Sequence, residues 1–153
     1  LRWNKVIICT DADVDGYQIR TLILAMLYRL TPSLIEAGKI FIAESPLFEI
    51  THRVKREEKT FFAYTEREKS ELLSQLGADR CTLQRSKGLG ENEPEMMWQT
   101  TMNPQTRRLI QVVAEDTDKT LDVFDMLLGD NLAARKLHIE ENGYRYLDML
   151  DIG

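Results

Sequence analysis

The chain has 153 residues, of which 43% are hydrophobic and 29% charged, and its formal net charge is −5. These values indicate one globular domain with at most a small appendage, and they argue against a generic nucleic-acid coat protein, which would be basic. No apolar run approaches the ~20 residues of a membrane-spanning helix, and the two cysteines form no disulfide framework or zinc motif, which predicts a reducing, cytoplasmic setting.

The first predicted element is a buried strand that ends in acidic residues. Lys5–Gly16 reads KVIICTDADVDG, and its unbroken apolar run predicts a strand buried on both faces, as in a parallel sheet. Asp11, Asp13 and Asp15 follow at alternate positions, where neighbouring carboxylates repel by about 2.5 kcal/mol at an effective dielectric of about 20. A cation would offset this repulsion, and oxygen ligands favour Mg²⁺ before Mn²⁺. We therefore predict a metal site at the carboxyl end of this strand, where open α/β sheets bind ligands.

Other structures share this spacing of acidic residues. A solvated turn that caps a helix N-terminus also favours aspartate. An EF-hand loop is excluded because Leu22 stands at the twelfth position, where a glutamate is required. An aspartyl-phosphate phosphohydrolase stays open, although Asp15 departs from its pattern and only Lys87 and Glu115–Asp116 are available for its later residues.

A strand–helix–strand unit is predicted at the beginning of the chain. Apolar residues at a 3.6-residue period predict a helix from about 17 to 30, and a short helix then begins at Pro32 and ends at Gly38. Residues 39–44 form a second strand, which completes a right-handed βαβ unit. Because a parallel strand needs neighbours on both sides, we expect the chain to begin inside a larger domain that supplies a further N-terminal strand, before Leu1.

The middle of the chain predicts a small insertion at about 47–80. Residues 47–54 and 60–64 fit the two strands of an antiparallel hairpin. The sequence Thr65-Glu66-Arg67-Glu68 is a capping box that opens a short helix. Cys81–Arg85 then predicts a third strand.

A second candidate site follows this strand directly. Arg85–Glu91 reads RSKGLGE, which places Lys87 between a strand and a glycine-containing turn. Gly88 and Gly90 permit close approach of the backbone, whose N–H groups can bind an anion, and Lys87 would add a point charge for a phosphate. Such turns are common, so the segment by itself is a weak signal of function.

The remaining third of the chain is predicted to be mostly helical. Helix starts are marked by prolines or capping residues, which are Pro94, Pro104, Thr117 and Asp130. Residues 111–114 are expected to return to the sheet. We therefore divide the chain into a sheet domain at 1–115 and a helical tail at 116–153.

Four long stretches together resemble one protein family. They are TDADVDGYQIRTL at 10–22, the passage at 36–48 that contains AGKIFIAESPLF, QRSKGLGENEPEMMWQTTMNPQTRRL at 84–109 and FDMLLGDNLAARKLHIEEN at 124–142. The family is the B subunit of bacterial type IIA topoisomerases, which comprise DNA gyrase and topoisomerase IV. The resemblance runs nearly end to end and concerns the C-terminal part of that subunit, namely the latter half of its Toprim domain and the tail.

The resemblance implies a fold and a metal site. The fold is α/β, with a Rossmann-like Toprim parallel sheet flanked by helices, a small antiparallel hairpin insertion and a helical C-terminal tail. Asp11 and Asp13 match the family's metal ligands and would act in catalysis through bound Mg²⁺, with Mn²⁺ as a substitute. Asp15 matches a third and weaker ligand.

The resemblance also implies partners. Lys87, Gly88 and Gly90 match a motif that faces double-stranded DNA, and Arg20 lies on the helix that faces the same region. A tyrosine of the A subunit would attack a DNA phosphate within an A2B2 heterotetramer, and ATP would be used by a domain that this sequence does not contain.

Departures from the family limit what the isolated chain can do. The family's metal-binding glutamate, in an EGDSA motif, does not occur in this sequence. Tyr17-Gln18 stand where the family often has Ser-His, and Ser86 replaces a frequent tyrosine. We therefore expect the isolated chain to be inactive. A non-catalytic docking module for the A subunit and DNA is the alternative.

Overall fold

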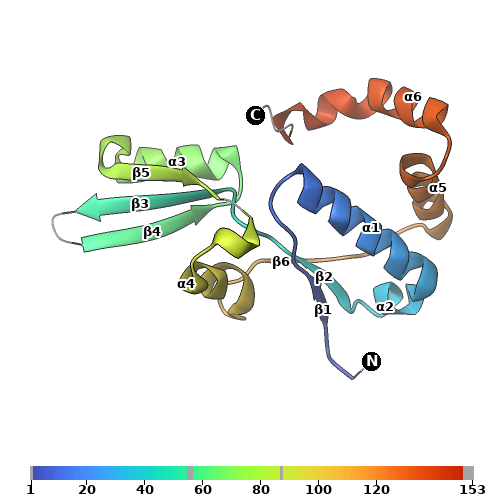
Figure 1. The fold of residues 1–153 in the computed structure, drawn as a ribbon, viewed down its shortest axis with the longest axis horizontal. Coiled ribbons are helices and arrows are strands. Elements are labelled where there is room, and N and C mark those ends of the chain that lie inside the picture. The colour runs from blue at the N-terminus through green and yellow to red at the C-terminus, as the bar shows by residue number, and fades with distance from the viewer. Residues whose placement is uncertain (1, 55–56, 87, 150–153) are drawn as a thin grey trace.

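The protein is built around two small three-stranded sheets (Figure 1). The computed structural model describes residues 2–54, 57–86 and 88–149. The first sheet has the strand order β1-β2-β6, with bounds Val6–Ile8, Ile40–Ala43 and Leu109–Gln111. The second sheet has the order β4-β3-β5, with bounds Glu57–Ala63, Phe48–Val54 and Cys81–Arg85.

The first sheet carries the predicted βαβ unit. Strands β1 and β2 pair in parallel, and α1 (Val14–Leu30) and α2 (Pro32–Glu36) connect them. A buried cluster lies between these helices and the sheet, and it consists of Ile8, Tyr28, Ile35 and Ile40. Strand β6 runs antiparallel to β2 and begins two residues before the predicted return at 111. The α/β fold class is confirmed, and the sheet is mixed.

Strand β1 is less buried than its apolar run predicts. Ile8 is buried, but Val6 and Ile7 are only partly buried and Cys9 is exposed. The reason is its place in the sheet, because β1 stands at one edge of the strand order and pairs only with β2 among the described strands. The expectation of a strand buried on both faces is therefore wrong for this chain.

The second sheet and α3 (Glu66–Leu76) form the predicted insertion. Strand β3 pairs antiparallel with both β4 and β5, and α3 packs three leucines against Phe48, Ile50 and Ala63. One half of the predicted capping box is confirmed, because the Glu68 N–H donates to the Thr65 hydroxyl at 3.0 Å. The Glu68 carboxylate accepts from the Tyr64 N–H instead of from that of Thr65. The third predicted strand is also confirmed, but it joins the hairpin as β5, so that this sheet continues beyond residue 80 to Arg85.

The remaining elements lead back to β6 and on to the tail. Between β5 and β6 lie η2 (Leu89–Glu91), α4 (Pro94–Met97) and η3 (Trp98–Met102). The helix start predicted at Pro104 is wrong, because residues 104–106 form a turn. The tail consists of α5 (Thr117–Leu128), α6 (Leu132–Asn142) and η4 (Gly143–Met149). The observed caps of α5 and α6 are Asp116 and Asn131, each one residue from the predicted position.

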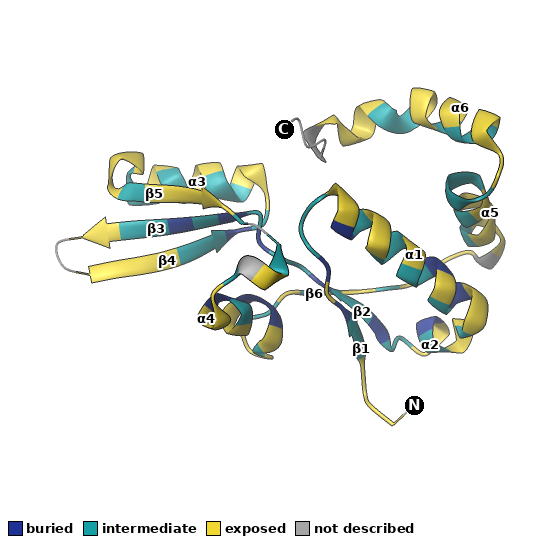
Figure 2. Ribbon diagram, viewed as in Figure 1, coloured by how far each residue is buried: buried dark blue, intermediate teal, exposed yellow. Residues whose placement is uncertain are grey.

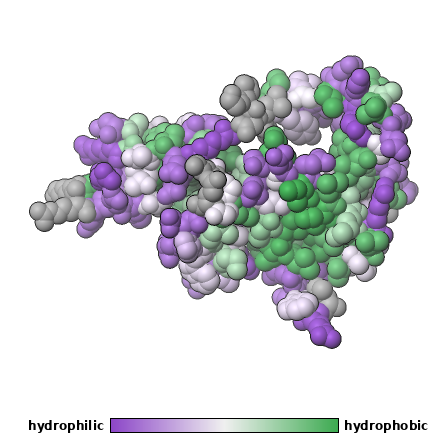
Figure 3. Space-filling view, viewed as in Figure 1, coloured by the Kyte–Doolittle hydropathy of each residue, from purple (hydrophilic) through white to green (hydrophobic). Residues whose placement is uncertain are grey.

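Helix α1 buries only part of its apolar surface. Helix α5 docks beside it, with the rings of Phe124 and Tyr28 5.7 Å apart and an ion pair between Arg29 and Asp125. A second apolar stripe of α1 is about half exposed or more, and it consists of Ile19, Leu22, Met26 and Leu30. Exposed residues recur along α1 in Figure 2, and hydrophobic side chains gather over α1 and the first sheet in Figure 3. No helix among the described residues has the length and apolarity needed to cross a membrane.

A polar joint links the two sheets, and it consists of Tyr64, Glu68 and Arg108. Arg108 immediately precedes β6, and its Nη1 donates to Glu68 Oε1 at 2.8 Å. Its guanidinium carbon lies 3.9 Å from the centre of the Tyr64 ring. The second carboxylate oxygen of Glu68 accepts from the Tyr64 N–H at 2.9 Å. The hydrogen bond from Arg108 is the main cause that lowers the pKa of Glu68.

The joint predicts how stability depends on pH. The substitution Glu68→Gln keeps an acceptor for the Tyr64 N–H but removes the negative charge. Because the pKa of Glu68 is lowered from its ordinary value of 4.5, its contribution is present above that value and is lost as the pH falls through the folded-state pKa. At about pH 7 we expect Glu68→Gln to lose at most about 1 kcal/mol, since both partners are partly exposed.

Urea denaturation of the wild type and Glu68→Gln at about pH 7, 5 and 3 measures this difference. We expect the two proteins to converge in free energy of unfolding toward the lowest pH. A difference that stays constant over this range would show that the charge of Glu68 does not contribute.

Candidate functional site

The acidic turn between β1 and α1 is tightly closed. Asp13 is the N-cap of α1, and its Oδ1 accepts from the Gly16 N–H at 2.7 Å. A Cβ on Gly16 would lie only 2.1 Å from the carbonyl oxygen of Asp11, so no side chain fits at this position. The capping interpretation of the acidic residues is thus confirmed for Asp13, and the same hydrogen bond fixes where its carboxylate points.

The glycine loop, which follows β5 and contains Gly88 and Gly90, lies against Asp11 at the start of the acidic turn. The Leu89 N–H donates to Asp11 Oδ1 at 2.8 Å. Gly88 lies so close that a Cβ there would be 3.0 Å from Asp11 Oδ2. The two candidate sites of the sequence are therefore one site. The anion that this loop binds is the carboxylate of Asp11 itself.

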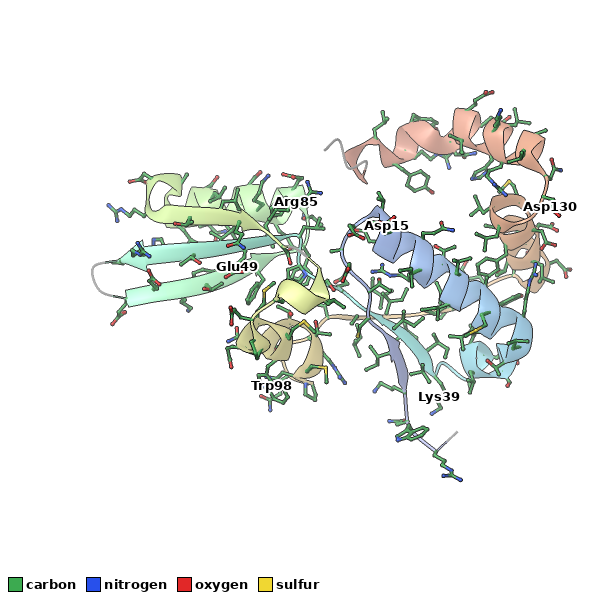
Figure 4. The ribbon with its side chains drawn as sticks, viewed as in Figure 1. Asp15, Lys39, Glu49, Arg85, Trp98 and Asp130 are labelled. Carbon is green, nitrogen blue, oxygen red and sulfur yellow. The ribbon has the colours of Figure 1, made fainter. Side chains whose placement is uncertain are left out.

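The third acidic residue lies apart from these contacts. Asp15 is exposed in the first turn of α1, whereas Asp11 and Asp13 are partly buried. In Figure 4, Asp15 marks the N-terminal end of α1, and Arg85 marks the end of β5, from which the glycine loop departs. The three carboxylates thus differ in environment, with one exposed and two held by backbone N–H groups.

The acidic turn offers carboxylate oxygens, which suit a hard cation, but few ligating side chains come together there. Carboxylate oxygens are the ligands that Mg²⁺ and Mn²⁺ prefer. Asp11 and Asp13 each use Oδ1 for a backbone N–H. Among the described residues, no three side chains of His, Cys, Asp or Glu come together as a metal site. The described residues alone therefore do not make up a metal site.

Arg20 is anchored at the base of the acidic turn. Its Nε and Nη2 donate to the hydroxyl of Thr10 at 3.3 and 3.2 Å, and its guanidinium lies 5.1 Å from the centre of the Tyr17 ring. Thr10 is buried and immediately precedes Asp11. Arg20 thus lies beside the acidic turn, and its role in DNA binding stays a prediction.

The other predicted residues are placed less fully. Lys87 lies outside the described residues. Gly90 is in η2, where a Cβ would meet nothing within 4 Å. Sequence reasoning assigned no role to Leu89 or Thr10, although both make contacts at the site. The sequence predicted that backbone N–H groups of the glycine-containing turn bind an anion, and this prediction could have pointed to the Leu89 N–H.

Two family models and several relatives match this chain. The Toprim domain family matches residues 1–45, and the family described as DNA gyrase B subunit, carboxyl terminus, matches residues 78–140. The DNA gyrase B subunit of Clostridium acetobutylicum is 44% identical over 151 residues, that of Thermotoga maritima 40% over 149, and that of Halalkalibacterium halodurans 45% over 153. These alignments cover 97%, 97% and 99% of this chain. The chain belongs to the DNA gyrase B family.

The two family matches cover different parts of the candidate site. The chain spans about a quarter of the length of these relatives, since each alignment covers 23% of the relative. The acidic turn lies within the Toprim match, and the glycine loop lies within the gyrase B match. The hydrogen bond from Leu89 to Asp11 therefore joins the two family regions. A Toprim domain implies use of a divalent metal ion.

The contact between Gly88 and Asp11 predicts that substitution by alanine destabilises the protein more at Gly88 than at Gly90. In Gly88→Ala the new methyl group would press on the Asp11 carboxylate, which the Leu89 N–H holds in place. We expect a loss of about 1 kcal/mol in the free energy of unfolding, because the methyl group or the hydrogen bond must give way.

Gly90→Ala is the matched control, since a methyl group there meets open space, and we expect a change within about 0.5 kcal/mol. Urea denaturation of both variants measures the difference. Equal effects of the two substitutions would contradict the close approach at Gly88.

Proposed function

We propose that this chain is the metal-binding part of the DNA cleavage–religation site of a type IIA topoisomerase B subunit. It would act with a tyrosine of the A subunit to change DNA topology. The observation that carries the proposal is the pair of partly buried carboxylates, Asp11 and Asp13, in one closed turn at the carboxyl end of β1, within the Toprim match. Open α/β sheets bind ligands at such strand ends.

Asp11 and Asp13 would hold the metal ion, with Mg²⁺ preferred and Mn²⁺ as a substitute. Asp15, exposed at the helix start, would be a weaker third ligand. When bound, the ion would stabilise negative charge on a DNA phosphate and on the oxygen that leaves it. Further ligands would come from other parts of the B subunit, such as the glutamate that the family resemblance implies.

The chain's own residues would prepare this site by fixing the carboxylates. The Gly16 N–H orients Asp13, and the Leu89 N–H orients Asp11. A side chain whose position is fixed before the ligand binds loses less entropy on binding. Arg20 beside the turn, and Lys87, Gly88 and Gly90 in the loop, would face the DNA backbone.

The wider assembly is part of the same proposal. We expect double-stranded DNA and the A subunit as partners in an A2B2 heterotetramer in the cytoplasm, with ATP used by another part of the B subunit. This explains how a chain of net charge −5 can serve DNA chemistry, because a cation at the acidic turn would offset the phosphate charge.

A non-catalytic docking module is the second candidate. It is favoured by one observation, namely that no three metal-ligating side chains come together among the described residues. In that case the carboxylates of Asp11 and Asp13 would serve only to cap α1 and to hold the glycine loop.

Substitution of Asp13 by asparagine separates the two candidates. Asparagine is also a good N-cap, so Asp13→Asn should keep the start of α1 while it removes the charge. We expect a loss of about 100-fold or more in plasmid cleavage by the B subunit of which this chain is part, reconstituted with its A subunit, Mg²⁺ and ATP, and a smaller loss for Asp15→Asn.

Binding of Mn²⁺ to the same B subunit provides a second readout, because paramagnetic resonance detects the ion without any turnover. We expect Asp11→Asn and Asp13→Asn to weaken this binding. Unchanged cleavage and unchanged Mn²⁺ affinity in both variants would refute the metal site and leave the docking module.

A further inference from the structure

The joint of Tyr64, Glu68 and Arg108 connects the first sheet, which leads into the acidic turn, with the second sheet, from which the glycine loop departs. We propose that Arg108 is a positioning residue that clamps the second sheet to the first and thereby holds the Leu89 N–H on Asp11. The proposal deepens the proposed function, since it concerns the same carboxylate. Its structural part needs neither metal nor DNA.

Only three residues separate the last bond to the second sheet from the bond to Asp11. The Ser86 N–H donates to the Leu47 carbonyl at 2.8 Å, so the backbone is still bonded to the second sheet at this point. Leu89, three residues later, already donates to Asp11 at the end of β1. Three residues reach at most about 10 Å. A rotation of the second sheet away from the first would therefore pull Leu89 off Asp11.

Arg108 is placed to resist such a rotation. On the side of the first sheet, its carbonyl accepts from the Glu44 N–H at 3.1 Å, directly after β2, and Arg108 itself leads into β6. On the side of the second sheet, its guanidinium binds Glu68 on α3 and stacks on Tyr64, which directly follows β4. One residue thus contacts elements of both sheets.

The chemistry of the joint suits a rigid clamp. A guanidinium is planar and can stack on a ring while it donates to a carboxylate, which a lysine ammonium cannot do in the same geometry. Glu68 is itself fixed, because its other oxygen accepts from the Tyr64 N–H and its own N–H donates to Thr65. The hydrogen bond between Arg108 and Glu68 lowers the pKa of Glu68 and raises that of Arg108, as expected for a pair that favours both charges.

The connection between β2 and β3 attaches the second sheet to the first at one point. Pro46 is fully buried within it, and the Ser45 hydroxyl donates to the Thr10 carbonyl, just after β1, at 3.3 Å. These contacts fix where the second sheet is attached. The Arg108 side chain acts at a second point, on Tyr64 and α3, and two points of attachment restrict rotation where one does not.

Hydrogen exchange of the Leu89 amide in the 153-residue chain tests the clamp. The exchange of single amides is followed by NMR, without metal, DNA or the A subunit. We expect the wild-type Leu89 amide to be protected and Arg108→Gln to reduce its protection at least about tenfold, while amides of β3, β4 and α1 keep theirs. Unchanged protection of Leu89, or a wild-type amide that is not protected, would overturn the proposal.

Three further variants isolate the contact. Glu68→Gln keeps the helix cap and is expected to reduce Leu89 protection in the same direction, which decides the matter if Arg108→Gln fails to fold. Arg108→Lys keeps the charge but loses the planar stack, and we expect it not to restore full protection. Arg67→Gln is the matched control, because it removes the exposed pair with Glu71 on the same helix and should leave Leu89 unchanged.

The outcomes distinguish the clamp from the proposed function. A fall in Leu89 protection together with full activity of Asp13→Asn would support the clamp and refute the metal site. Unchanged Leu89 protection together with an inactive Asp13→Asn would refute the clamp and leave the metal site in place.

Discussion

The two backbone hydrogen bonds that hold Asp11 and Asp13 in one short turn are the interactions on which the candidate site depends. The fold places Asp11 and Asp13 at the end of β1 and gives each a backbone N–H, one from the start of α1 and one from the glycine loop. The N-terminal end of α1 adds a favourable dipole. The first hydrogen bond is local, whereas the second requires a loop 78 residues away to be held in place.

The two sheets divide this work. The first sheet with α1 sets the acidic turn, and the second sheet with α3 carries the loop that closes on it. Each has its own small buried cluster, so their relative orientation depends on short connections and on polar contacts such as those of Arg108.

The surface of the described residues fits a piece of a larger assembly. Strand β1 is at an edge, and one apolar stripe of α1 is about half exposed. The relatives are about four times as long as this chain, and together with an A subunit they would offer several partners for such surfaces. Because no three metal-ligating side chains come together among the described residues, the proposed metal site would need ligands from elsewhere in the B subunit.

The sequence by itself determined the elements with strong local signals. The helix after the acidic turn, the capping box at Thr65 and the hairpin follow from periodicity and side chains within a few residues of each other. It also determined the family and the candidate acidic residues. Only the tertiary structure decided that β5 joins the hairpin, that β6 runs antiparallel, and that Leu89 reaches Asp11. These features depend on pairing between segments that are far apart in the chain, and the hydrophobic pattern of one segment does not reveal its partner.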